Sequence, residues 1–435
     1  MSRLPSDVIG DAYSRRGAMA VLEDLVEVEN RMAGQDGEHE GADVVAEAFE
    51  DAGLREVSTE EFEIPGWWRG SSALTLTEDD RRYDGSHQVI ALPGTPAGDV
   101  EADLVDVGHG TPEEFEDVDV EGQIAMASSL TPDDYDRWLH RTEKYRMAIE
   151  NGAEGFVFRN HVEGCLPPTG GIGEDDGPGA IPAVGVSREL GYRLKRYCED
   201  RDVPARLELD CRNEETTSVN VEGVVGPDTE TEVLVTAHHD AHDIAEGAGD
   251  NGAGSALVAE IGRILAQVED DLETKVRCVT FGAEEVGLYG SHHMSETRDL
   301  DAIETVINLD GIGYSRNLSI STHGFDVLSE TFETVAEELA VPIEVDDGIS
   351  PHSDHWPFVQ KGVPGVMARS TTDESGRGWG HTHADTLDKL DIRDFRDLAV
   401  PLAEGVLRLT DADVTPEQVT PDVIEERAAE QGYDI

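Results

Sequence analysis

The chain has 435 residues, of which 94 are Asp or Glu and 33 are Lys or Arg, so its formal charge is −61. A surface of this charge excludes the basic face that nucleic-acid binding requires, and equally excludes attraction to anionic lipid. The length predicts two or three domains. Acidic residues occur throughout the chain and only five of the 33 basic residues are lysines. This haloarchaeal-like composition is typical of a cytosolic protein in multimolar salt, which screens the self-repulsion of the charges. An acid-rich protein of a mesophile is the alternative.

The location predicted from the sequence is the cytoplasm. The first residues contain no apolar segment of the kind found in secretory signals, and no apolar run approaches the roughly 20 residues of a membrane span. Four cysteines are too few for a disulfide framework at this length, and Cys278 lies in an apolar run that predicts a buried thiol. The oligomeric state has no signal in the sequence.

The first 210 residues divide into two regions with different patterns of predicted secondary structure. Apolar spacing predicts helices over 15–35 and 41–53, and a strand over 57–62 follows. Beyond residue 80 the segments become short, β-like and punctuated by Gly and Pro, with one helix near 138–151. This change predicts a separate, mostly β domain inserted in the chain. Its predicted strands are 89–92, 102–107, 123–127, 155–158 and 182–186.

From about residue 215 strands and helices alternate, which predicts an α/β sandwich around a mixed or parallel sheet. The predicted strands are 232–237, 275–282, 303–309, 317–321 and 363–368. The predicted helices are 253–266, 324–340 and 391–410. The last 25 residues are acidic, with a short helix predicted at 421–431.

Imidazoles and carboxylates follow the predicted strands, and open α/β sheets bind ligands at the carboxyl ends of their strands. The residues are His238-His239-Asp240, Glu284-Glu285, Asp310, Asp250 just before a helix, and His381 in the loop after the last strand. Imidazole and carboxylate without thiolate suit an open, catalytic site for Zn²⁺ or another borderline divalent ion. The set exceeds the needs of one ion and fits two ions that share a carboxylate. One member of the Glu284-Glu285 pair is then left to carry protons.

Seven motifs in order resemble those of the M28 family of zinc exopeptidases, over about 215–410. They are His238-x-Asp240, Gly247-Ala-x-Asp250-Asn251-x-x-Gly254, Glu284-Glu285-x-Gly287-x-x-Gly290-Ser291, Asn308-Leu309-Asp310, Ser353-Asp354-His355-x-x-Phe358, Gly362-x-Pro364 and His381-Thr-x-x-Asp385-Thr386. The resemblance implies the three-layer α/β/α zinc-exopeptidase fold with a mixed sheet. It also implies an aminopeptidase that removes N-terminal residues from peptide substrates.

The inserted region resembles a protease-associated (PA) domain. The matching segments are Val120-Glu121-Gly122-Gln123-Ile124, Ala148-x-x-x-Gly152-Ala153-x-Gly155 and Ile181–Ser187. Several M28 aminopeptidases carry such an insert. The implied division is an N-terminal part of the peptidase domain (1–78), the PA domain (79–210), the main peptidase body (211–412) and an acidic tail (413–435).

The M28 resemblance implies a role for each site residue. His238 and Asp310 would hold one zinc, Glu285 and His381 the other, and Asp250 would bridge the two; Co²⁺ or Mn²⁺ are alternatives to zinc. Glu284 would be the general base, and Asp240 would orient the His238 ring. The resemblance also predicts a cis peptide between Asp250 and Asn251.

The sequence departs from the family near Ser353-Asp354-His355, where some relatives place an oxyanion-stabilising tyrosine shortly upstream. No tyrosine stands there, and His352 or His355 is the expected substitute. Trp379 is a candidate for the substrate pocket. Adjacent histidines leave the choice between His238 and His239, and between His381 and His383, to the register of the motifs.

Other functions remain open at this stage. A carboxypeptidase or an M20-like amidohydrolase has the same ligand logic, although M20 enzymes usually carry a Lys where Asn251 stands and a different insert. A glutaminyl cyclase of this fold lacks a PA insert, and a non-catalytic binding module has lost zinc ligands that are present here. Gly247–Gly252 satisfies GxGxxG but lies too far from its strand for dinucleotide binding. A Ser353–His355 nucleophile lacks the GxSxG elbow.

Overall fold

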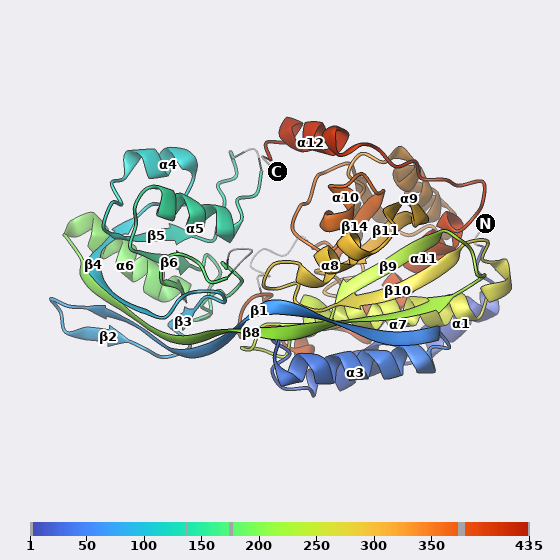
Figure 1. Cartoon of the computed structure of the whole chain (residues 1–435), viewed down its shortest axis with the longest axis horizontal. Helices are drawn as coiled ribbons and strands as arrows, with labels where there is room; N and C mark the ends of the chain where they lie inside the picture. Colours follow the sequence, from blue (N-terminus) through green and yellow to red (C-terminus); the bar gives the residue numbers. More distant parts are fainter. Residues whose placement is uncertain (1–2, 136, 174–176, 373–378, 434–435) are drawn as a thin grey trace.

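The computed structural model describes residues 3–135, 137–173, 177–372 and 379–433, which form two lobes (Figure 1). Two 22-residue strands, β1 (Arg55–Leu76) and β8 (Pro204–Val225), pair antiparallel and run along both lobes. The sequence predicted only 57–62 of β1 and nothing of β8. Both strands carry many exposed polar residues, which hide the alternation that identifies a strand.

The larger lobe contains a mixed sheet in the order β13-β12-β14-β11-β9-β10-β8. Pairing is parallel for β10 with β9, β9 with β11, and β11 with β14. The strands are β9 (Glu232–His238), β10 (Lys275–Phe281), β11 (Ile303–Leu309), β12 (Leu318–Ser321), β13 (Ile343–Asp346) and β14 (Gly365–Ser370). All but β13 correspond to predicted strands.

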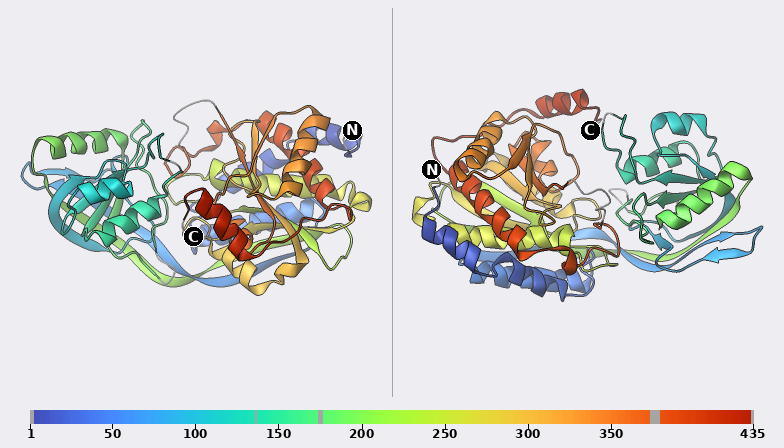
Figure 2. Two further views of the ribbon diagram at one scale, coloured as in Figure 1. Left: turned by 90° about the horizontal axis from the view of Figure 1, so that it is seen from above. Right: turned by 180° about the vertical axis from the view of Figure 1, so that it is seen from behind.

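Helices cover both faces of this sheet, as the three-layer prediction requires (Figure 2). On one face α7 (Ala253–Ala266) packs against β9, α2 (Ala18–Val26) and α11 (Ile392–Leu409). On the other face α8 (Tyr289–Thr297) packs against α10 (Trp356–Val359). The remaining helices of this part are α9 (Asp326–Leu339) and α12 (Pro421–Glu430). The predicted helices 253–266, 324–340, 391–410 and 421–431 are confirmed.

The N-terminal helix prediction is wrong. Of the predicted helix 15–35 only α2 (Ala18–Val26) forms; a separate helix, α1 (Ser6–Ser14), precedes it, and the two are separated at Gly17. Gly17 has a φ of +43°, which ends a right-handed helix and which other residues adopt at a cost. The next helix, α3 (Asp36–Asp51), begins five residues before its predicted start.

The smaller lobe continues the sheet of the larger one through β8, in the order β8-β4-β5-β6-β7-β3. Its strands are β2 (Arg81–Tyr83), β3 (Val89–Ala91), β4 (Gly98–Asp106), β5 (Ile124–Ser128), β6 (Gly155–Arg159) and β7 (Ala183–Val186). Its helices are α4 (Pro112–Asp117), α5 (Arg141–Glu150) and α6 (Arg188–Asp200). The five predicted strands and the 138–151 helix are confirmed, and α4 and α6 are additional.

Candidate active site

The carboxyl ends of three adjacent parallel strands build the floor of the site. His238 is the last residue of β9, and Asp310 follows β11 directly. Glu284 and Glu285 follow β10 after two small residues, Gly282 and Ala283. Because β9 lies between β10 and β11, these side chains meet at one edge of the sheet. Asp250 reaches the same place from the short helical turn η1 (Ala248–Gly252) before α7.

Two groups of ligand-type atoms lie next to each other. In the first, His238 Nε2 is 3.4 Å from Asp250 Oδ1 and 3.7 Å from Asp310 Oδ1. In the second, His381 Nε2 is 3.2 Å from Asp250 Oδ2 and 3.5 Å from Glu285 Oε2. Ligands at 2.0–2.1 Å from a tetrahedral metal are about 3.3 Å apart, so both groups have the spacing of a metal site. The two oxygens of Asp250 each face a different group.

The residues present therefore fit two divalent ions. The buried atoms His238 Nε2 and Glu285 Oε1 have no hydrogen-bond partner within the described ranges. Buried polar atoms are normally satisfied, and an unpaired imidazole nitrogen beside unpaired carboxylates marks the place of a ligand. The second group includes a residue that the sequence analysis did not single out as a ligand, His242, whose Nε2 is 2.9 Å from Glu285 Oε2.

The protonation of these groups reflects their crowding. Burial opposes the charged form of His238, but the carboxylates of Glu284, Asp240 and Asp250 outweigh it and raise the pKa well above its usual range. Burial raises the pKa of Glu284 well above its usual range, and Glu285 adds to the rise by repulsion. Burial and the Asp250 charge likewise raise the pKa of Glu285 to about 8. The site gathers more negative charge than its histidines can balance.

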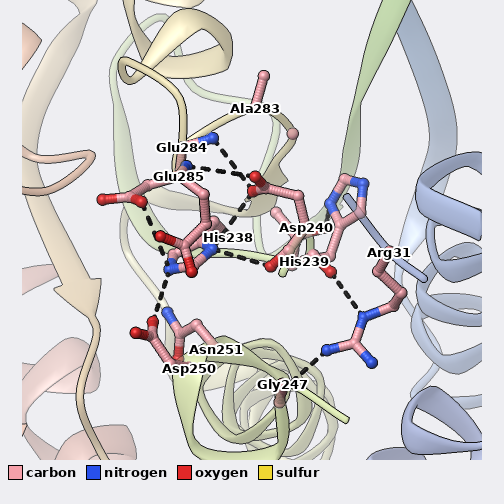
Figure 3. A network of polar contacts seen from close by, with 12 residues as sticks. Arg31, His238, His239, Asp240, Gly247, Asp250, Asn251, Ala283, Glu284 and Glu285 are labelled. Atoms are coloured by element: carbon pink, nitrogen blue, oxygen red, sulfur yellow. Dashed lines mark hydrogen bonds and ion pairs between the residues drawn. The ribbon is translucent and has the colours of Figure 1, made fainter. Parts of the chain in front are cut away.

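Asp240 fixes the geometry of this cluster (Figure 3). Its two carboxylate oxygens accept the backbone N–H groups of Glu284 and Glu285, at 3.1 and 3.2 Å. The Nδ1 atom of His238 lies 3.1 Å from the Asp240 carbonyl oxygen and 3.3 Å from its carboxylate. Asp240 thus ties the Glu284-Glu285 turn to the His238 ring. The predicted cis peptide between Asp250 and Asn251 is confirmed.

Arg31 is a supporting residue that the sequence analysis missed. Its buried guanidinium donates to the carbonyl oxygens of Leu25, His239, Glu246 and Gly247. Figure 3 shows the contacts with His239 and Gly247. Arg31 therefore holds both ends of the loop between His239 and Gly247. Burial lowers the Arg31 pKa to about 10. An arginine whose partners are all backbone carbonyls has no motif in the sequence by which its role could be predicted.

The smaller lobe contacts the second ligand group directly. Thr169 exchanges two hydrogen bonds with His381: its N–H donates to the His381 carbonyl at 2.8 Å, and its own carbonyl lies 3.3 Å from His381 Nδ1. The N–H of Gly171 donates to the Glu285 carbonyl at 3.3 Å. Nearby, Arg69 donates to Asp243 and to the Thr169 hydroxyl.

A pocket of about 610 Å³ opens over the ligands between the lobes. The smaller lobe contributes Trp138, His140 and Arg141, and the larger lobe contributes residues 348–352, Met367 and Arg369. His352 lines this pocket, as expected for a substrate residue. His140 and His352 stack at 4.8 Å between ring centroids, and Trp138 packs edge-on against both.

Two other candidates for substrate contact lie away from the pocket. His355 is fully buried and its Nε2 lies 2.8 Å from the Ser350 carbonyl and 3.1 Å from His323 Nε2. Trp379 packs against Tyr314 and does not line the pocket. Their positions therefore do not support the substrate contact expected of His355 and Trp379.

The ambiguous histidines are separated by their surroundings. His239 Nδ1 lies 3.2 Å from the Thr280 hydroxyl, on the side of the strand opposite the ligands. His383 lies near the carbonyl oxygens of Ile244 and Ser86. The geometry favours His238 and His381 as ligands.

Comparison with known proteins identifies the family. Residues 220–404 match the model of peptidase family M28, and residues 100–194 match the model of the PA domain. The chain is 29% identical over 397 residues to aminopeptidase YwaD of Bacillus subtilis strain 168, covering 87% of this chain and 81% of the relative. The chain therefore contains a peptidase domain of family M28 and a PA domain, and it is a hydrolase.

Solved structures agree with this assignment. A peptidase M28 precursor from Shewanella amazonensis SB2B has a TM-score of 0.79 at 25% identity, with 95% of this chain and 98% of that chain covered. A zinc aminopeptidase from Bacillus subtilis has a TM-score of 0.69 at 25% identity, with 91% and 95% covered. The whole two-lobed arrangement is thus shared.

Proposed function

We propose that the chain is an aminopeptidase that hydrolyses the N-terminal peptide bond with the aid of two zinc ions. The observation that carries the proposal is Asp250, whose two oxygens face two separate imidazole–carboxylate groups. The zinc aminopeptidase among its structural neighbours supports the choice of metal and the choice of substrate terminus.

The residues divide between the two ions as their distances suggest. His238 and Asp310 would hold one ion, His381 and Glu285 the other, and Asp250 would bridge them. Two ions bound here would lower the pKa of a water molecule and polarise the scissile carbonyl. Asp240 would keep His238 in the tautomer that leaves Nε2 free for the ligand role.

Glu284 is the proposed general base. Its Oε2 lies 3.9 Å from His238 Nε2, and its side chain lines the pocket without being one of the five proposed ligands. Its buried position favours uptake of a proton from the attacking water. Glu284 would then deliver that proton to the leaving amine. Because Glu284 transfers a proton from the water to the amine, its removal should affect turnover more than substrate binding.

The test is hydrolysis of leucyl-p-nitroanilide in multimolar KCl, with and without a chelator, followed by zinc add-back. We expect chelation to abolish the activity and zinc to restore it. Glu284→Gln should lower kcat by about 100- to 10,000-fold while two equivalents of zinc remain bound. Two bound zinc ions with no hydrolysis of any substrate bearing a free N-terminus would refute the proposal. Hydrolysis at the C-terminus would favour the carboxypeptidase alternative.

We also propose that the protein works in concentrated salt, in the cytosol. The described residues contain no helix long and apolar enough to cross a membrane. Its charge of −61 supports the salt requirement, because screening relieves the repulsion between surface carboxylates. The midpoint of thermal unfolding should rise between 0.1 M and 3 M KCl. An unchanged or falling midpoint would contradict this proposal.

A further inference from the structure

Arg141, the first residue of α5, places an unusual charge in the pocket. Its Nε–H donates to the Gly171 carbonyl at 3.0 Å, and its side chain lines the pocket above the ligands. Its terminal Nη groups have no partner among the described residues. The guanidinium packs so closely on Gly170 that a side chain at that position would overlap it. The backbone thus fixes the direction of Arg141, and none of the described residues binds its Nη donors.

An unpaired arginine is unexpected in this chain. With 94 carboxylates to 33 basic residues, most arginines find a partner, as Arg137 does with Glu143 in the segment just before α5. Arg141 lies near acidic groups, yet none of the described ones binds it. A guanidinium with free donors at a pocket wall is well suited to a bidentate contact with a carboxylate.

Arg369 places a second positive charge in the same pocket. It lies on β14, next to Ala368, whose carbonyl accepts the N–H of Asp310. The side chain is exposed to the pocket and has no ion-pair or hydrogen-bond partner in the part of the chain that the structure describes. Met367, two residues earlier on the same face of the strand, also lines the pocket. The pocket therefore has a ligand-bearing floor and a cationic group on each lobe.

We propose that Arg141, together with Arg369, binds a carboxylate of the peptide, so that the enzyme prefers substrates that carry a free carboxylate close to the scissile bond. The α-carboxylate of a di- or tripeptide and the side chain of an acidic residue share this chemistry. This inference rests on the proposed aminopeptidase function. The contact would come from α5, which lies in the part of the chain that matches the PA domain.

The experiment compares kcat/KM within three pairs of substrates, in each of which the first member carries a carboxylate and the second an amide in its place. The pairs are leucylglycine and its amide, leucylglycylglycine and its amide, and leucylaspartamide and leucylasparaginamide. Wild type should favour the carboxylate member of at least one pair by about 10- to 100-fold. Arg141→Gln should remove that preference and leave the amide substrates within about threefold. The matched control is Arg146→Gln, which removes the same charge from an exposed position of the same helix. Arg369→Gln should reduce the preference by a smaller factor.

The pattern across the pairs identifies the source of the carboxylate. A preference confined to the two free peptides supports the α-carboxylate, and one confined to leucylaspartamide supports the acidic side chain. Equal kcat/KM within every pair would overturn the proposal. An equal loss on all substrates in Arg141→Gln would also overturn it, since Arg141 would then act on the reacting carbonyl or on the fold.

A binding measurement separates this inference from the proposed function. Zinc-loaded Glu284→Gln protein, which should not turn over, is titrated with leucylglycine and with leucylglycinamide. Tighter binding of leucylglycine that is lost on adding Arg141→Gln supports the carboxylate contact even if no hydrolysis is ever detected. Equal binding of the two compounds would overturn it, whether or not the wild-type enzyme is an aminopeptidase.

Discussion

The two halves of the proposed metal centre are supported in different ways. The first half, His238 and Asp310, stands at the ends of adjacent strands in the middle of the sheet. Its supports come from the same lobe: Asp240 beside His238, and Ser353, whose hydroxyl donates to Asp310 Oδ2 at 2.6 Å. The larger lobe by itself therefore determines its geometry.

The second half, Glu285, His381 and His242, lies on loops. His381 follows a long connection after β14 and has a φ of +57°. The smaller lobe braces this half, through Thr169 on His381 and Gly171 on Glu285. The difference indicates that the first proposed ion site depends on the larger lobe alone, whereas the second also depends on how the PA domain docks. We therefore expect the second ion to be the more weakly held.

Asp250 joins the halves, and its loss should have the largest effect. Asp250→Ala removes one ligand from each half, and we expect kcat/KM to fall by at least about 1,000-fold, since each ion contributes several kcal/mol to the transition state. Elemental analysis should show less than one bound zinc per chain. Asp347→Ala, an exposed carboxylate close to the pocket loop, is the control and should bind two. Two tightly bound ions in Asp250→Ala would show that the halves are independent.

Gly171→Ala is the sharpest test of the difference between the halves. A Cβ at this position would lie 2.7 Å from the Glu285 carbonyl oxygen, so the loop must move away from the second half. Loss of such supporting contacts typically lowers metal affinity 10- to 100-fold. Chelator competition should show this loss for one ion and an unchanged affinity for the other.

The control for Gly171→Ala is Gly10→Ala. A Cβ at Gly10 meets no atom within 4 Å, so the methyl group is added without displacement. Equal weakening of both ions in Gly171→Ala, or weakening of neither, would contradict the view that the PA domain supports only the second half.

The sequence predicted the site residues at strand ends better than those whose positions depend on loops. His238, Glu285 and Asp310 could be placed because apolar strands end at or just before them, and parallel strands bring their ends together. His242 and Thr169 could not, since their positions depend on loop conformations and on the docking of two lobes. β8, which links the lobes, was missed because its exposed polar residues hide the alternation that identifies a strand. The bounds of the domains and the roles of the ligands stay predictions.

Substitution of Arg69 tests the docking of the smaller lobe at a residue that contacts no proposed ligand. Arg69 and Asp243 form an ion pair with side chains only 14% and 12% exposed, and Arg69 also donates to the Thr169 hydroxyl. Arg69→Gln leaves Asp243 without its main partner, which should lower the free energy of unfolding by about 1–3 kcal/mol. The second ion should be held a few-fold less tightly. Denaturant unfolding and chelator competition measure the two effects.

A double-mutant cycle with Asp243→Asn separates the ion pair from its consequences. If the two single changes are coupled in stability but the zinc affinity never changes, the pair supports the fold without supporting the second half. That result would limit the influence of the PA domain to the contacts of Thr169 and Gly171.

The smallest expected effect concerns acid stability, through a buried histidine pair next to the loop of Ser353. Burial lowers the pKa of His323 to about 4 and that of His355 well below its usual range. Asp346 and Arg369 face His323, and His352 and Arg369 face His355, but neither set reverses the direction. Between pH 4 and 6.5 the unfolded chain therefore binds more protons than the folded one. Stability must fall as the pH falls through this window, by about 1.4 kcal/mol per pH unit for each histidine.

His323→Asn removes one of the two titrating groups while keeping a residue that tolerates the positive φ of this position. We expect the slope of unfolding free energy against pH, measured on metal-free protein, to decrease by up to about 1.4 kcal/mol per pH unit below pH 6.5. Metal-free protein is required because ligand protonation also releases bound ions. An unchanged slope would mean that His323 is already protonated in the folded state. The His323–His355 pair would then carry a positive charge in the folded protein, and acid would not destabilise the region around Ser353 through these two histidines.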